Sequence, residues 1–218
     1  CYNCSMKIQA VIIDLDGTIT THDMSVVLAK AVGKAKETAQ LNQLFWEGKL
    51  QGVAALVQQV NFLKGLTRHD IRTIVARNDY LRPGAKELFE YFSKNNIISI
   101  ISSGSTLPLL ELYKEKLGAD YIVGSNPKMV GDMIDSISEE DYSGVDFKIR
   151  DAQAILENLD ISAGNVVAIG DSLSDKGMFA FAKVSIGVDV KPGVRELIDY
   201  EVRGSLLNAL SILDTISH

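Results

Sequence analysis

The sequence predicts an α/β fold: a doubly wound, Rossmann-like parallel sheet with helices on both faces. Three short apolar runs, each followed by a polar turn, predict buried strands at Ala10–Ile13, Ile97–Ile101 and Asn165–Ile169. Longer segments between them carry apolar residues at helical spacing. Strands that alternate with helices favour a parallel sheet with right-handed crossovers. Ligands of such sheets bind beyond the carboxyl ends of the strands, so a site is expected there.

Length and composition limit the possible functions. A chain of 218 residues suits one large domain, or a core domain with a smaller insert. Its 46% hydrophobic and 23% charged residues are typical of a globular protein. The net charge of -6 disfavours a nucleic-acid partner, and no apolar run approaches a membrane span. No leader pattern opens the chain, so we expect a cytoplasmic protein, monomeric or homodimeric, without a membrane partner.

Residues 1–5 precede Met6 and are interpreted as a tag or an upstream extension. They contain both cysteines, Cys1 and Cys4. A C-x-x-C pair can bind metal or do redox chemistry, but this one has no second pair and precedes the first strand. We expect neither role, and no disulfide can support the rest of the fold.

The segment after the first strand is predicted to be helical. Met24, Val27 and Leu28 begin the first of several apolar stripes, with Asp23 as a possible N-cap. Thr67 with Asp70 three residues later resembles a capping box. No strand is expected before Asp79. A helical insert over the carboxyl end of a sheet can act as a lid that excludes water, or simply add core.

The main domain resumes at Pro83-Gly84 with a helix, and its remaining elements follow in order. The sequence predicts strands at Ile97–Ile101, Tyr121–Val123, Asn165–Ile169 and Val184–Val188. A β-hairpin is predicted within Asn126–Ile137. Helices are predicted from about Thr106, from Asp146, from Lys191-Pro192-Gly193, and over Leu206–Leu213.

Two carboxylates, Asp14 and Asp16, follow the first strand and are separated by one residue. In extended backbone, residues two apart point to the same side, so both would face one crevice. Acids this close repel each other unless a cation or a shared proton offsets the charge. The alternative is an Asp-Gly turn with both acids solvated.

Three further pieces favour a site. The turn Ser102–Ser105 lies between a strand and a helix, where a hydroxyl and free N–H groups can bind an anion. We favour Ser102 as the binding hydroxyl, with helix capping as the alternative. Lys148 lies in the first turn of a helix, which is mildly unfavourable for a cation and suggests a functional reason. The segment GDSLSD, Gly170–Asp175, follows a predicted strand.

Together with DLDGT at Asp14–Thr18, these pieces resemble the haloacid dehalogenase (HAD) superfamily of aspartate-nucleophile phosphatases. Within it, the chain is similar to the phosphoserine phosphatase branch, which shares the 23-residue spacing from Lys148 to Asp171. The resemblance begins at Lys7 and covers nearly the whole chain. It implies an HAD-like core of residues 6–20 and 81–218, with a small helical cap domain of residues 21–80 inserted after the first strand.

The resemblance implies an Mg²⁺-dependent phosphomonoester hydrolase acting on a small phosphorylated metabolite. Asp14 is expected to attack phosphorus and form an aspartyl-phosphate. Asp16 is expected to protonate the leaving alkoxide and then accept a proton from water. Ser102 and Lys148 would bind and orient the phosphoryl oxygens, together with the adjoining Ser103 and Gly104.

The metal is expected to be Mg²⁺, held by hard oxygen ligands. By the same resemblance these are Asp14, the backbone carbonyl of Asp16, and Asp171. Asp175 would support these ligands without touching the ion, or would act on the ion through a water molecule. Its alternative reading is an acid at a helix N-terminus.

The insert departs from the phosphoserine phosphatase branch. Aligning EGKL (Glu47–Leu50) places Gln59 where that branch has an arginine that grips the substrate carboxylate. Gly52 stands in the place of a phenylalanine. Asp23 replaces a glutamate that pairs with the substrate amine. We therefore expect the chemistry without selectivity for phosphoserine.

Three alternatives stay open. The protein could be an authentic phosphoserine phosphatase, or a catalytically idle binding or regulatory module on the same fold. Since all five catalytic positions are filled, an idle module is disfavoured. A receiver domain also uses a strand-end Asp with Ser/Thr and Lys, but the helical insert and the chain length count against it.

Overall fold

The computed structural model describes residues 6–46, 49–50 and 52–217. The predictions for residues 1–5, with Cys1 and Cys4, lie outside the described residues, as do Glu47 and Gly48 of the EGKL segment. Within the described part, no helix is both long enough and apolar enough to cross a membrane.

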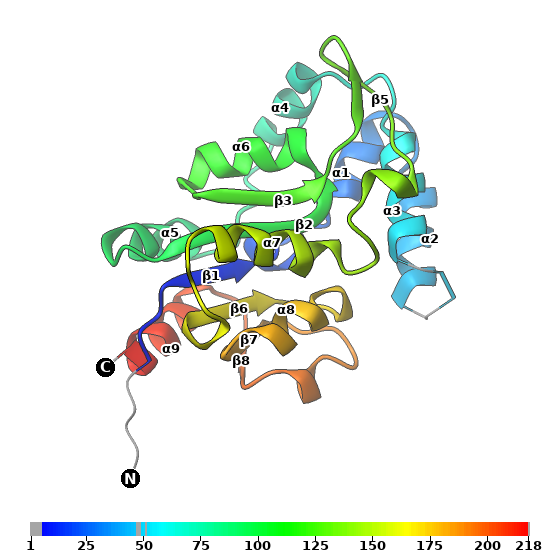
Figure 1. Cartoon of the computed structure of the whole chain (residues 1–218). Coiled ribbons are helices and arrows are strands. Elements are labelled where there is room, and N and C mark those ends of the chain that lie inside the picture. Colours follow the sequence, from blue (N-terminus) through cyan, green and yellow to red (C-terminus); the bar gives the residue numbers. More distant parts are fainter. Residues whose placement is uncertain (1–5, 47–48, 51, 218) are drawn as a thin grey trace.

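A six-stranded sheet forms the centre of the molecule (Figure 1). Its strand order is β3-β2-β1-β6-β7-β8, and all neighbouring pairs are parallel, which confirms the predicted sheet. The strands are β1 (Ala10–Ile13), β2 (Ile98–Thr106), β3 (Tyr121–Ser125), β6 (Val166–Gly170), β7 (Val184–Val188) and β8 (Tyr200–Val202).

Strand β1 is buried on both faces of the sheet, as its continuous apolar run predicts. Val11 and Ile13 belong to one hydrophobic cluster, whereas Ala10 and Ile12 belong to the other. Because successive side chains of a strand point to opposite faces, helices must cover both faces. The doubly wound arrangement follows from this.

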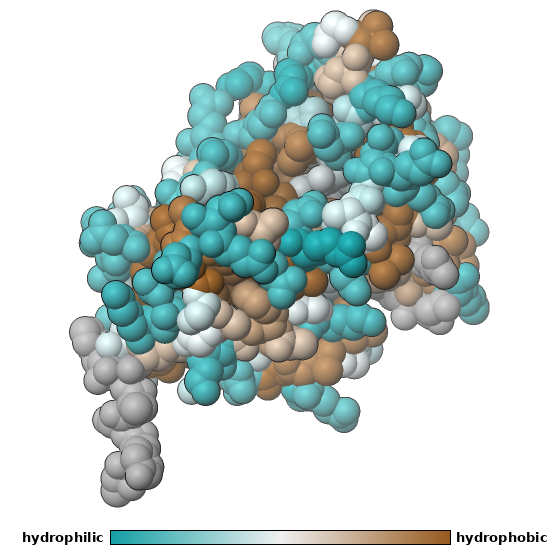
Figure 2. All heavy atoms as spheres, viewed as in Figure 1, coloured by the Kyte–Doolittle hydropathy of each residue, from teal (hydrophilic) through white to brown (hydrophobic). Residues whose placement is uncertain are grey.

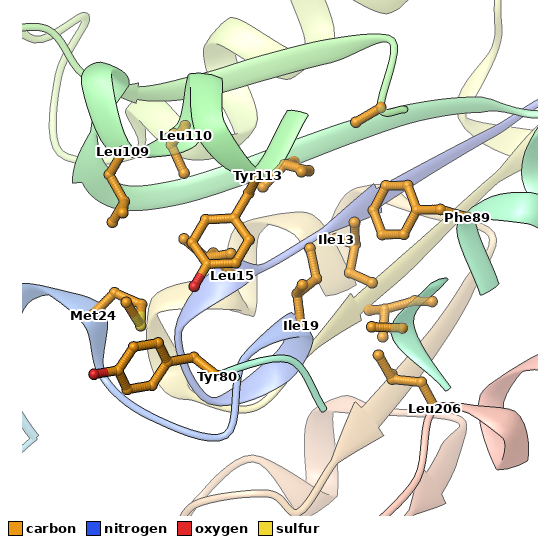
Figure 3. Packing of buried hydrophobic residues seen from close by; sticks show 14 of the residues in the cluster. Ile13, Leu15, Ile19, Met24, Tyr80, Phe89, Leu109, Leu110, Tyr113 and Leu206 are labelled. Atoms are coloured by element: carbon orange, nitrogen blue, oxygen red, sulfur yellow. The ribbon is translucent and has the colours of Figure 1, made fainter. Parts of the chain in front are cut away.

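The cluster of Val11 and Ile13 includes residues of α5 (Ala85–Lys94), α6 (Leu107–Leu117) and α9 (Leu207–Ser217), together with residues of helices between β1 and α5. Helices α7 (Phe147–Asn158) and α8 (Lys176–Phe181) contribute to the other cluster. Figure 3 shows the ring of Tyr113, from α6, over Leu15 at the end of β1. The turn that follows β1 is thus packed against the core.

The described residues between β1 and α5 form α-helices, as predicted: α1 (Met24–Ala31), α2 (Ala35–Trp46), α3 (Gly52–Phe62) and α4 (Arg68–Ala76). We call residues 21–80 the insert. It lies beside the carboxyl end of the sheet, together with the predicted hairpin β4 (Lys128–Val130) and β5 (Met133–Ser136) (Figure 1). The two predicted caps are present: Asp23 accepts from the Val26 amide, and Thr67 and Asp70 form a complete capping box.

Two predictions of secondary structure are wrong. No helix begins at Lys191-Pro192-Gly193; the chain makes one 3₁₀ turn at Arg195–Leu197 and then the edge strand β8, which the sequence analysis missed. Gly193 has a φ of +84°, which is incompatible with a helix at that residue. Strand β2 also continues past Ile101 to Thr106, so the serine turn is extended backbone with a shift in its pairing to β3.

Candidate active site

Asp14 follows β1 at the centre of the carboxyl edge of the sheet, and only 4% of it is exposed. Lys148, in the first turn of α7, donates to Asp14 Oδ1 at 2.7 Å and to Asp175 Oδ1 at 2.5 Å. The three side chains come from different crossovers of the fold. They meet because the strands β1 and β6 are adjacent and parallel.

Asp171 and Asp175 lie after β6, and the carboxylates of Asp14, Asp171 and Asp175 offer oxygens within 4.8 Å of one another. Asp175 Oδ2 accepts from the backbone amides of Asp171 and Ser172 at 3.0 and 3.1 Å, so both of its oxygens have protein partners. Asp171 Oδ2 pairs with Lys191 Nζ at 3.0 Å, while its Oδ1 is buried without a hydrogen-bond partner.

The buried charges shift one another's pKa values. Burial raises the pKa of Asp14 well above its usual value, against the opposing effect of Lys148. Burial likewise raises the pKa of Asp171, with Lys191 opposing. For Lys148, burial alone lowers the pKa, but the adjacent carboxylates of Asp14 and Asp175 raise it overall. The site therefore has more buried negative charge than its lysines offset, and this favours a bound cation.

Asp16 takes a different direction from Asp14 because the chain leaves the strand conformation after β1 and coils through Leu15–Ile19. Gly17 adopts a φ of +88°, and a Cβ there would lie 2.1 Å from Asp171 Oδ2, so only glycine fits. The Asp16 carboxylate accepts from the Ser103 and Ser105 hydroxyls, both at 2.8 Å, and from the Met24 amide at 2.7 Å. Both acids line one cavity, as predicted.

Burial, followed by the charge of Asp23, raises the pKa of Asp16 to about 6. The hydrogen bonds from Met24, Ser105 and Ser103 act in the opposite direction. A carboxyl with a pKa near neutrality can hold or release a proton close to physiological pH. This property suits an acid–base group.

The serines at the end of β2 have different hydrogen-bond partners. Ser102 is fully buried, and its hydroxyl donates to the Lys148 carbonyl at 3.0 Å. Ser103 and Gly104 line the cavity, together with Ser105. The role of Ser102 as the anion-binding hydroxyl stays a prediction. Ser105, which the sequence analysis did not select, has the same contact with Asp16 as Ser103.

A polar network crosses the insert. Gln59 Nε2 donates to Asn42 Oδ1 at 2.7 Å, and Asn42 Nδ2 donates in turn to Asp23 Oδ2. Asp23 Oδ1 accepts from the Ser25 hydroxyl at 2.5 Å. All four residues line the cavity. Asn42 was missed because a single polar residue in a helix carries no positional signal.

Arg82, also missed, fixes the turn that carries Asp16. Its guanidinium donates to the carbonyls of Gly17 at 2.6 Å and Thr18 at 2.8 Å, and it pairs with Asp189. Lys191 was missed too, although its place just beyond the carboxyl end of β7 is a signal that could have found it.

The cavity between the insert and the sheet has a volume of about 670 Å³ and contains Asp14, Asp16 and Lys148 on one side. Asp23 and Gln59 line it from the insert. Figure 2 shows a mostly hydrophilic surface on the face drawn, with apolar residues reaching the surface beside α3. The arrangement can bind a cation and an anionic group next to a buried carboxylate, with space for a larger organic group.

Comparisons with known proteins give consistent results. The family described as haloacid dehalogenase-like hydrolase matches residues 11–180. A phosphoserine phosphatase of Archaeoglobus fulgidus is 26% identical over 206 residues, 94% of this chain and 60% of that protein. This chain thus spans less than two thirds of that relative's length. One from Methanocaldococcus jannaschii is 24% identical over 198 residues, 88% of this chain and 91% of that protein.

Among solved structures, a phospho-aspartyl intermediate analogue of phosphoserine phosphatase is similar, with a TM-score of 0.81 at 23% identity. The match covers 94% of this chain and 99% of that one. At that identity, the likeness shows the fold alone.

Proposed function

Since the chain belongs to the haloacid dehalogenase-like hydrolase family, we propose that it is a phosphatase that cleaves a small phosphorylated metabolite through an aspartyl-phosphate on Asp14. The observation that supports this most directly is the Asp14 carboxylate. It is buried at the carboxyl edge of the sheet, paired with Lys148 at 2.7 Å, and open to the cavity.

In the first step, an Asp14 oxygen attacks phosphorus while the bond from phosphorus to the leaving alkoxide breaks. Asp16 gives its proton to that alkoxide, which leaves as the free alcohol. In the second step, Asp16 takes a proton from water as the water attacks phosphorus. Inorganic phosphate leaves and the Asp14 carboxylate is restored.

The contacts of Asp16 support its proposed acid–base role. Its hydrogen bonds to Ser103, Ser105 and the Met24 amide hold the carboxyl at the boundary between core and insert. This boundary is where the leaving group of a substrate attacked by Asp14 would lie. Lys148 would offset charge on the phosphoryl oxygens, and the backbone and hydroxyls of Ser102, Ser103 and Gly104 would orient them.

The acidic cluster fits Mg²⁺. Asp171 has a buried oxygen without a partner, and three carboxylates lie within reach of one ion. Asp14, Asp171 and the backbone carbonyl of Asp16 would hold it, while Asp175 would orient Lys148 and the loop at Asp171. When bound, Mg²⁺ would offset the negative charge that builds up when phosphate meets these carboxylates.

We further propose that residues 21–80 form a cap over a core of residues 6–20 and 81–218, and that this cap does not select phosphoserine. Gln59 is 4% exposed and donates to Asn42, so at this position the insert offers an amide and no guanidinium. An amide lacks the charge and the two-pronged geometry with which arginine binds a carboxylate. The expected loss of a charged hydrogen bond corresponds to about 10- to 150-fold in specificity for phosphoserine. A cytoplasmic location and a monomer or homodimer stay predictions.

An assay with and without Mg²⁺ over a panel of phosphate esters tests the function, because an idle module would release no phosphate from any of them. The variant Gln59→Arg should raise kcat/KM for phosphoserine. Its matched control is Gln58→Arg, the same change at the exposed neighbouring position. If phosphoserine is already the best substrate of the unmodified protein, the chain is an authentic phosphoserine phosphatase and the selectivity argument is wrong.

A further inference from the structure

The cavity continues well beyond the reacting carboxylates. Its volume of about 670 Å³ lies within the range of about 300–1,000 Å³ typical of pockets for organic ligands. The apolar residues that line it include three from the insert and two from the core. We call these the apolar wall: Phe45, Leu50, Leu56, Val145 and Leu173.

Two glycines let the apolar wall approach the reacting groups. A Cβ on Gly104 would lie 2.7 Å from Leu56 Cδ2, so Leu56 packs directly on the turn next to Ser103. A Cβ on Gly52 would lie 3.2 Å from the Phe45 ring. The Phe45 ring therefore borders the space that a larger residue at position 52 would occupy.

Two members of the apolar wall are exposed on the core side. Val145 is 69% exposed and Leu173 is 37% exposed, and both line the cavity. Single exposed apolar residues are common and need no explanation. Val145 and Leu173, however, share one cavity with the apolar residues of the insert. One apolar ligand in this cavity would remove the whole apolar wall from water.

Few cationic side chains along the cavity could bind a second anionic group on the ligand. Among the described lining residues, the cations are Lys148, Lys176 and Lys191. Lys148 and Lys191 contact Asp14 and Asp171 at the reacting end. Lys176 is exposed, in the first turn of α8 on the core side.

At the insert end of the cavity, the described polar residues are Asp23, Ser25, Asn42 and Gln59, which hydrogen-bond to one another. None of these four is basic. An anionic group placed there would lie beside the carboxylate of Asp23.

We propose that the physiological substrate is a phosphate monoester of an uncharged alcohol with an apolar carbon skeleton, which lies against the apolar wall. This inference rests on the proposed phosphatase function. It goes beyond the absence of phosphoserine selectivity, because it names the class of leaving group that replaces phosphoserine.

The test compares esters of primary alcohols, so that the leaving groups differ little in basicity. The panel contains 3-methylbutyl phosphate, 2-phenylethyl phosphate, 1-phosphoglycerol, phosphoserine and phosphoethanolamine, each with Mg²⁺. We expect kcat/KM for the two apolar esters to exceed that for phosphoserine by about tenfold or more. A preference for phosphoserine or for the cationic phosphoethanolamine overturns the inference.

Substitutions of the two core residues of the apolar wall test whether these residues cause the preference for apolar esters. Val145→Ser and Leu173→Ser should each lower kcat/KM for the apolar esters about three- to tenfold, with little change for 1-phosphoglycerol. The matched controls are Val130→Ser and Leu197→Ser, the same changes at residues that are 58% and 41% exposed and do not line the cavity. Equal effects of the wall variants and their controls overturn the inference. A fall in kcat/KM of Lys176→Gln that is larger for phosphoserine than for every other ester also overturns it.

Hydrolysis and binding together distinguish a failure of the proposed function from a failure of the substrate inference. If the panel is hydrolysed without preference for apolar esters, the phosphatase function stands and the inference is wrong. If no ester is hydrolysed, the function is wrong and the esters are not substrates; calorimetric binding of the same esters then decides only whether the cavity prefers this class of ligand. Tighter binding of the apolar esters than of inorganic phosphate supports that preference, and equal binding overturns it.

Discussion

Lys148 Nζ lies 2.7 Å from Asp14 Oδ1, although the two residues are 134 positions apart in the chain. The same ammonium contacts Asp175, so one buried cation offsets two buried carboxylates. This pairing explains why a lysine occupies the first turn of α7, where the helix dipole disfavours it.

Replacing Lys148 with Met should lower both activity and stability. Removal of one partner of a buried ion pair leaves uncompensated charge and costs about 3–5 kcal/mol in the free energy of unfolding. Urea unfolding measures this, with Lys176→Met, an exposed lysine, as the control for stability. An unfolding free energy within error of the wild type would contradict the assigned role of the pair.

Asp14→Asn should remove turnover without loss of the fold, because an amide cannot accept the phosphoryl group. Steady-state hydrolysis of an aryl phosphate should fall to background. Burial and the neighbouring acids make an ionised Asp14 costly in the metal-free protein. The variant should therefore melt at or above the wild-type temperature without Mg²⁺. Near-wild-type turnover in the folded variant would rule out Asp14 as the nucleophile.

Activity should depend on Mg²⁺, and Asp171→Asn, which alters a proposed ligand, should weaken metal binding by more than the factor of about 10 to 100 that is typical of losing a group behind a ligand. The partnerless Asp171 oxygen is the reason for this choice of residue. Metal titration after chelation, followed by activity and by calorimetry, provides two readouts. The control is Asp160→Asn, at an exposed residue with a φ of +55° that asparagine tolerates. Full activity in excess chelator would sink the metal-assisted mechanism.

Asp23→Asn should shift the pH dependence of kcat/KM. Burial first, and then the charge of Asp23, raises the pKa of Asp16 to about 6. A general acid must be protonated in the free enzyme, so kcat/KM falls as the pH rises through this pKa. Removal of the Asp23 charge lowers the pKa, and the fall should move to lower pH at fixed Mg²⁺.

Asparagine is as good an N-cap as aspartate, so α1 should keep its cap in that variant. Asp135→Asn, at a half-buried residue of the hairpin that pairs with Lys64, is the control and should leave the profile in place. A shift of the Asp23→Asn profile to higher pH would contradict the coupling between Asp23 and Asp16.

The insert should move about its two connections to the core. The predicted hinge segments, Ile19–His22 and Tyr80–Pro83, lie side by side: Thr21 donates its amide to the Tyr80 carbonyl at 3.0 Å, and Arg82 donates its amide to Ile19 at 2.8 Å. Hydrogen exchange of these amides should slow when Mg²⁺ and a phosphate analogue bind. Unchanged exchange with the ligand demonstrably bound would make the insert static.

The order of strands and polar turns was sufficient to predict much of the site. Carboxyl ends of neighbouring parallel strands meet at one edge, so the residues following β1 and β6 had to approach each other. This placed Asp14 and Asp171 together, and the helical spacing after Asp23 predicted the four helices of the insert. The missed strand β8 is three residues long at the edge of the sheet, too short for a clear alternation.

The sequence by itself determined which residue types stand at the end of each strand, and hence the chemistry available at the carboxyl edge. Tertiary structure alone decided where those side chains point. Asp16 contacts Ser103 and Ser105 because β2 runs on past the end of its neighbour β1, and Gln59 contacts Asn42 because α2 and α3 pack together. The physical reason is that periodicity describes a side chain only while the backbone stays regular. Beyond a strand end, direction depends on turn conformation and on contacts between residues distant in the chain.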